Sequence, residues 1–133
     1  MKNYEIKETK ETVYKTSDGY TFQLKEDAYD HICCKYAQDI VEGEPNTIDI
    51  EDDEIFKANI LEFYTFTDKE KLDMFIHGHL NNYYVRNSNE ILKEVKTIKE
   101  FPCILVIIDD NLFTKKSLVN KIKNVLNEVK EAL

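Results

Sequence analysis

The chain has 133 residues, 42% of them hydrophobic, and a formal net charge of −8 at pH 7. This length supports one domain, residues 1–133, with its own core. The acidity and the presence of a single arginine, Arg86, argue against general nucleic-acid binding, which needs clustered basic side chains, and favour basic partners. No segment has the ~20 apolar residues that cross a membrane, and residues 1–6 lack the apolar core of a secretion signal, so we expect a cytoplasmic protein that does not bind membranes.

The three cysteines do not form a disulfide framework, because their number is odd and two of them, Cys33 and Cys34, are adjacent. A reducing compartment suits them, and we expect small buried hydrophobic residues. His31 is not placed to activate Cys33, since side chains two residues apart on a helix do not face each other. Cys103 lies inside an apolar run. We therefore predict no catalytic residue and no enzyme activity.

Residues 4–22 predict a β-hairpin. Short stretches of alternating residues flank Ser17-Asp18-Gly19, and glycine supplies the positive φ that a three-residue loop with a bulge requires. This geometry places Thr16 near Tyr20 and Tyr14 near Phe22.

Helical spacing follows from Lys25 to Val41, where apolar residues recur at intervals of four, at Ala28, Ile32, Tyr36 and Ile40. Gly43 and Pro45 end this helix, because glycine tolerates a left-handed cap and proline cannot continue the hydrogen-bond ladder.

Residues 42–54 form the most acidic segment of the chain. We interpret the segment as a solvated linker, and its functional alternative is an acidic patch that meets a basic partner, formed by Glu51, Asp52, Asp53 and Glu54. A calcium loop starting at Asp49 is excluded, because its sixth position is not glycine and its twelfth is Ile60.

Residues 58–66 predict a strand with aromatic bulk. Thr67 and Glu70 form a capping box, so a helix begins there. Its buried stripe contains Leu72, Phe75, Ile76 and Leu80. The pattern of residues 89–99 fits both a helix and a strand, and we favour a helix.

The apolar run that ends at Asp109 predicts the central strand, residues 102–109. Its β-branched residues suit a strand, and the lack of polar alternation indicates cover on both faces. We place a turn at residues 111–114 and a long helix at residues 115–133, which packs on the sheet or forms a coiled-coil seam. The predicted fold class is α+β, a mainly antiparallel sheet with helices packed on one face.

Two pairs of residues could bind metal. Asp109 and Asp110 at the end of the central strand could hold Mg²⁺, but no phosphate-cradling glycine loop accompanies them, so we interpret them as turn residues. His77 and His79 could ligate zinc, but no companion pair has metal-ligand spacing. We favour surface histidines at a fraying helix end and predict no metal and no cofactor.

The segment Tyr83-Tyr84-Val85-Arg86, a short strand or an aromatic turn, is the best candidate contact site. Tyrosine and arginine dominate the residues that carry binding energy at protein interfaces. We therefore predict Tyr83, Tyr84 and Arg86 as partner-binding residues, together with the acidic patch.

The start of the chain resembles small uncharacterised phage and prophage proteins of low-GC Gram-positive bacteria. The resemblance lies in the hairpin around Asp18-Gly19, the aromatic Tyr20 and a helix that bears Ala28 and His31. It covers roughly the first quarter of the chain. It departs at Tyr20, where lysine usually follows the glycine, and at Ile32, where an acidic residue often follows the histidine.

The resemblance implies an anti-defence context, because small acidic phage proteins, anti-CRISPR proteins among them, often inhibit host defence enzymes. We therefore hypothesise an interaction protein that occludes a basic site on a host protein. Two alternatives stay open: a binder of a nucleotide signal or small enzyme that uses the tyrosines and Arg86, and a homo-oligomeric structural component assembled through the last helix.

Overall fold

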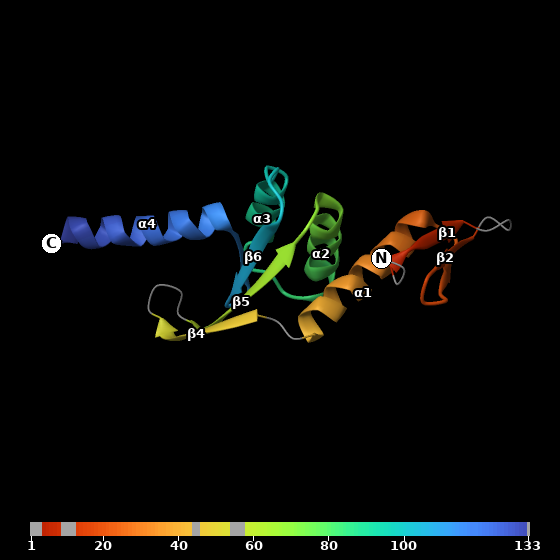
Figure 1. The fold of residues 1–133 in the computed structure, drawn as a ribbon, viewed down its shortest axis with the longest axis horizontal. Helices are drawn as coiled ribbons and strands as arrows, with labels where there is room; N and C mark the ends of the chain where they lie inside the picture. The colour runs from red at the N-terminus through yellow and green to blue at the C-terminus, as the bar shows by residue number, and fades with distance from the viewer. Residues whose placement is uncertain (1–3, 9–12, 44–45, 54–57, 133) are drawn as a thin grey trace. The chain divides into compact units, whose positions relative to one another are not determined.

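The computed structural model describes residues 4–8, 13–43, 46–53 and 58–132, and the fold is drawn in Figure 1. The chain divides into two compact units: unit 1 contains residues 1–44 and 70–84, and unit 2 contains residues 45–69 and 85–133. The single domain expected from the sequence stays a prediction, because compactness of a unit is not independent folding.

Unit 1 contains a small antiparallel sheet and two helices. The strands are in the order β1-β2-β3, with bounds Ile6–Glu8, Tyr14–Thr16 and Thr21–Phe22. The predicted hairpin is confirmed: Tyr14 lies opposite Phe22, and the Thr16 N–H donates to the Tyr20 carbonyl over 2.9 Å. Gly19 has a φ of +95°, so glycine is required at this turn.

The helices of unit 1 are α1, Lys25–Glu42, and α2, Lys69–Asn82, whose first residue belongs to unit 2. The apolar stripe predicted for α1 is confirmed by the burial of Ala28, Ile32 and Tyr36. Gly78 of α2 lies against α1, because a Cβ atom there would be only 1.9 Å from the Cys33 carbonyl oxygen. The two helices therefore approach each other at a point where only glycine fits.

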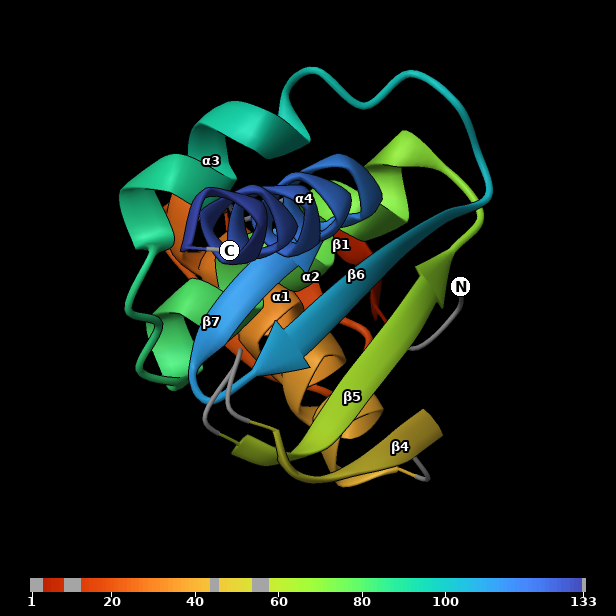
Figure 2. The same cartoon turned by 90° about the vertical axis from the view of Figure 1, so that its left-hand side faces the viewer.

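Unit 2 contains a four-stranded antiparallel sheet in the order β4-β5-β6-β7, which Figure 2 shows side by side. The bounds are Asn46–Asp53, Ala58–Phe66, Cys103–Ile108 and Asn111–Thr114. The apolar strand β6 is an interior strand, as predicted. The predicted α+β class is confirmed, with two antiparallel sheets in place of one.

The burial of the side chains of β6 differs along the strand. Leu105 and Val106 point to opposite faces and both are buried, so the middle of the strand is covered on both sides. Ile104 is 43% exposed, so the expected cover is missing at the start of the strand.

Two expectations about connecting segments are wrong. The acidic segment is not a solvated linker along residues 46–53, because β4 pairs with β5 there, with Ile48 opposite Leu61. The alternating Thr47-Ile48-Asp49-Ile50 carries this strand signal. The turn predicted at residues 111–114 is strand β7, since Leu112 and Phe113 are buried hydrophobic residues.

The turn lies two residues earlier, at Asp109 and Asp110. Both have positive φ, +48° and +65°, and Ile108 pairs with Asn111 on either side of them. This is the left-handed backbone of a two-residue hairpin, which Asp tolerates better than most residues. The interpretation of these aspartates as turn residues is therefore confirmed.

Unit 2 also contains α3, Ser88–Val95, and α4, Lys115–Ala132. The helix favoured for residues 89–99 is confirmed over residues 89–95, with Ile91 and Val95 buried on one face. Leu118 of α4 packs against Val106, Ile108 and Phe113, which confirms packing on the sheet for the first turns of the predicted long helix.

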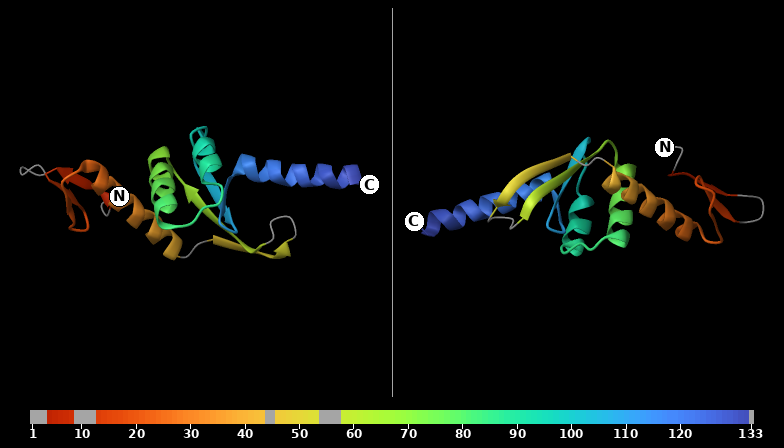
Figure 3. Two further views of the ribbon diagram at one scale, coloured as in Figure 1. Left: turned by 180° about the vertical axis from the view of Figure 1, so that it is seen from behind. Right: turned by 90° about the horizontal axis from the view of Figure 1, so that it is seen from below.

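Farther along α4, Ile122 and Val129 are exposed, and Val129 is 51% accessible. Figure 3 shows the helix continuing beyond the edge of the sheet of unit 2. Among the described residues, no helix combines the length and apolar character needed to cross a bilayer.

Candidate binding surfaces

The segment Tyr83 to Arg86 is a connection between α2 and α3, and it contains no strand. Within unit 2, the Arg86 backbone N–H donates to the Asp110 carbonyl over 2.9 Å. The Arg86 guanidinium lies 3.7 Å from the Asp109 carboxylate, and both side chains are largely exposed. The structure therefore brings together Arg86, predicted as a contact residue, and Asp109, weighed as a metal ligand, because the Asp109 carboxylate is the ion partner of Arg86 at the hairpin turn.

The two tyrosines of this segment belong to unit 1 and differ in exposure. Tyr84 is 72% exposed, as a contact residue should be. The ring of Tyr83 stacks on His79, with the ring centroids 4.8 Å apart. Tyr84 is therefore the stronger contact candidate of the two, while Tyr83 also supports the fold of unit 1.

The acidic patch lies on an edge strand. Glu51, Asp52 and Asp53 belong to β4, and Glu54 lies outside the described residues. Within the described ranges β4 pairs with β5 alone, so one side of its backbone has no strand partner there. Such an edge offers a row of N–H and C=O groups to another chain.

The opposite edge of the same sheet is closed. The Leu112 N–H of β7 donates to Asn87 Oδ1 over 2.9 Å, and Asn87 Nδ2 donates to the Leu112 carbonyl over 2.6 Å. This side chain satisfies the outward-facing backbone groups of β7 at that residue, as a neighbouring strand would. The two edges of the sheet therefore differ, and β4 is the one available for pairing.

The two histidines predicted at the surface have different environments. His77 is partly exposed and bonds to Asp30. His79 is only 5% exposed, so the surface prediction is wrong for this residue. Its ring stacks between Phe75 and Tyr83, four residues away on either side, and burial lowers its pKa to about 4. The described residues contain no cluster of three metal-ligating side chains.

The cysteines are poor nucleophiles. Burial raises the pKa of Cys33 to about 11, and it also raises the pKa of Cys34 and Cys103 above the ordinary value. The thiolate is the reactive form, and the raised pKa values favour the protonated, less reactive thiol in all three side chains. Cys33 is fully buried, as expected of a small hydrophobic residue.

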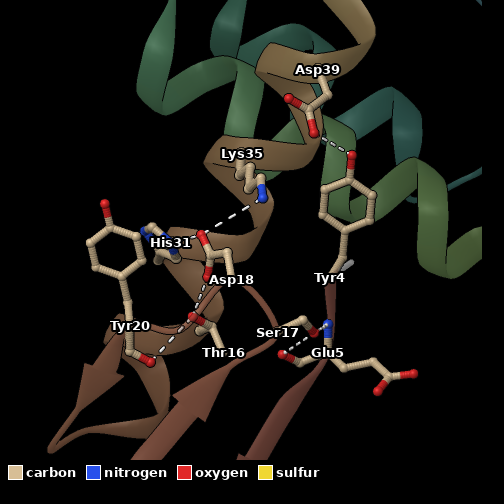
Figure 4. A network of polar contacts seen from close by, with 9 residues as sticks. All are labelled: Tyr4, Glu5, Thr16, Ser17, Asp18, Tyr20, His31, Lys35 and Asp39. Carbon is tan, nitrogen blue, oxygen red and sulfur yellow. Dashed lines mark hydrogen bonds and ion pairs between the residues drawn. The ribbon is translucent and has the colours of Figure 1, made fainter. Parts of the chain in front are cut away.

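A polar network in unit 1 joins the hairpin to α1, as Figure 4 shows. His31 Nε2 lies 2.7 Å from Asp18 Oδ2, and the Thr16 hydroxyl donates to the same carboxylate. Burial opposes ionisation of Asp18, but the bonds from Thr16 and His31 prevail and lower its pKa. The Tyr20 ring packs on His31, with centroids 4.7 Å apart. The pattern of Asp18-Gly19, Tyr20 and His31 is therefore explained by contacts that hold the hairpin against α1.

Sequence spacing alone did not indicate this polar network, because Asp18 and His31 are separated by a turn and a strand. The signal that could have found it is the placement of an acidic turn residue and a histidine on consecutive elements.

Comparison with protein-family models, with curated protein sequences and with solved structures finds no match to this chain.

Proposed function

We propose that the chain is a small acidic interaction protein, without enzyme activity, that occludes a basic site on a partner protein. The observation that carries this proposal is the position of the acidic residues Asp49, Glu51, Asp52 and Asp53 on the edge strand β4. An edge strand can pair with an extended segment of another protein through its backbone, and its carboxylates attract lysine and arginine.

The net charge of −8 favours the same kind of partner, because it speeds encounter with a basic surface at low salt. Enzymes that bind nucleic acid have such surfaces. The resemblance to phage proteins makes host defence enzymes of that kind the first partners to test. Phage origin, inhibition of defence and a cytoplasmic location are parts of this proposal.

The test compares two variants with the same net charge. In the edge variant, Ser replaces Glu51, Asp52, Asp53 and Glu54; in the control, Ser replaces Glu26, Asp27, Glu128 and Glu131. A partner is recovered by pull-down from host lysate, identified by mass spectrometry and purified, and its association rate with each variant is measured at rising salt. We expect the edge variant to associate about tenfold more slowly and with a weaker salt dependence.

The association rate of the control variant should fall less than that of the edge variant, since the control removes the same charge from other surfaces. An unchanged association rate in the edge variant removes the proposal. Equal slowing in both variants would mean that β4 acts only through its contribution to the net charge, which contradicts its role as the contact element.

A further inference from the structure

Unit 2 contains an open cleft of about 1340 Å³ on the side of the sheet where α4 begins. The lining residues come from the end of α3, from residues 97–100 and Pro102, from the start of β6, from Thr114 and from the first half of α4. Among the described side chains, none of those that line the cleft belongs to β4, and β5 lies between β4 and β6 in the sheet.

The cleft has accessible apolar residues in its lining. Ile98, Pro102, Ile104 and Val119 line it, with Ile104 43% and Val119 39% exposed. Leu118 packs against the buried cluster that contains Val106 and Ile108 on the same face of β6, while Ile104 at the start of the strand stays exposed. An accessible aliphatic surface of this kind is typical of a contact site for other apolar side chains.

The charged residues that line the cleft are mainly basic. Six lysines line it against two glutamates, Glu94 and Glu100, a formal balance of +4 in a chain of net charge −8. In the described part of the chain, five of these lysines form no ion pair. They are Lys93, Lys99, Lys115, Lys116 and Lys123. The cleft therefore concentrates uncompensated positive charge on a protein that is acidic elsewhere.

We infer that this cleft binds an acidic peptide segment of a partner protein, with aliphatic side chains against its apolar residues and carboxylates against its lysines. Protein interfaces combine apolar contacts with polar and charged ones in this way. Nucleic acid fits less well, because none of the described lining residues is an aromatic residue or an arginine that could stack on bases. Charge complementarity selects an acidic occupant over a basic one.

The experiment uses the full chain and a fluorescein-labelled amphipathic peptide in which Glu and Leu repeat at helical spacing. Fluorescence anisotropy gives Kd at low and high salt. The cleft variant carries Lys116→Glu and Lys123→Glu, and a second variant carries Val119→Asp. The matched control carries Lys7→Glu and Lys130→Glu, two exposed lysines outside the cleft. We expect saturable binding that weakens about tenfold in each cleft variant and less than about twofold in the control.

Three outcomes overturn the inference. The first is no saturable binding of the peptide by the unmodified chain. The second is an equal loss of affinity in the control and the cleft variants, which shows attraction to general charge. The third is tighter binding of a labelled single-stranded oligonucleotide that the cleft variants abolish, which assigns the cleft to nucleic acid. Circular dichroism of each variant excludes unfolding as the cause of lost binding.

Discussion

At the scale of single residues, Gly78 shows how one position sets the packing of two helices. A Cβ atom there would lie 1.9 Å from the Cys33 carbonyl oxygen, which is backbone and cannot rotate away. Gly78→Ala should therefore push α1 and α2 apart and lower the free energy of unfolding by about 3 kcal/mol. Urea denaturation followed by circular dichroism measures this loss.

Gly43→Ala is the matched control for that substitution. Its Cβ atom would meet the Asp39 carbonyl oxygen at 3.1 Å, which a small shift relieves, and its φ is negative. We expect a change below about 1 kcal/mol. Equal midpoints for the two variants would show that the close approach at Gly78 does not limit the packing of the helices.

His79 gives the protein a pH-dependent stability. Its pKa is lowered from 6.5 to about 4 in the folded state, because the ring is buried between Phe75 and Tyr83. Between these two values the unfolded chain binds a proton at His79 and the folded chain does not. The free energy of unfolding should therefore fall as the pH drops from 6.5 toward 4, by up to about 3 kcal/mol, and be independent of His79 above that window.

The measurement is urea denaturation at several pH values for the natural chain and for His79→Phe. Phenylalanine keeps a ring in the stack but cannot titrate, so the difference between the two pH profiles isolates His79 from the carboxylates. Parallel profiles between pH 6.5 and 4 would mean that the folded protein accepts a proton at His79.

At the scale of elements, the predictable parts of the fold are those with a local cause. The glycine turn, the spacing of Ala28 and Ile32, and the β-branched run of β6 each depend on neighbouring residues, and the structure confirms them. Strand β4 was missed because its charges resemble a linker, and its pairing with β5 is the tertiary contact that overrides them.

The candidate sites show the same division. The sequence predicts the acidic segment and Arg86 as contact residues, but it does not predict the contacts made by Asn87 or the cleft. Asn87, which closes the β7 edge, bonds to a residue 25 positions away. The lysines of the cleft are spread from Lys93 to Lys123 and converge only because β6 and β7 return the chain to α3. Long-range convergence of this kind leaves no periodic signal in a single sequence.

At the scale of the whole molecule, the question is whether the two units unfold together. The chain passes between them three times, at residues 44/45, 69/70 and 84/85, so each unit consists of two separate segments. Helix α2 of unit 1 is joined to β5 through Thr67 and Asp68 at one end and to α3 through Tyr83–Asn87 at the other. Loss of unit 1 therefore removes the constraint that holds the ends of two elements of unit 2, which favours one cooperative transition.

This prediction is checked by hydrogen exchange of the full chain with Gly78→Ala, a substitution confined to unit 1. If the chain is one domain, the protected amides of β6 in unit 2 should lose the same free energy of opening as those of α1. Undiminished protection of β6, with faster exchange in α1 alone, would divide the chain into two folding units. Unit 2, with the hydrogen bonds between the Asn87 side chain and β7, would then be stable by itself. The lysine cleft and the acidic edge strand would both lie on that unit.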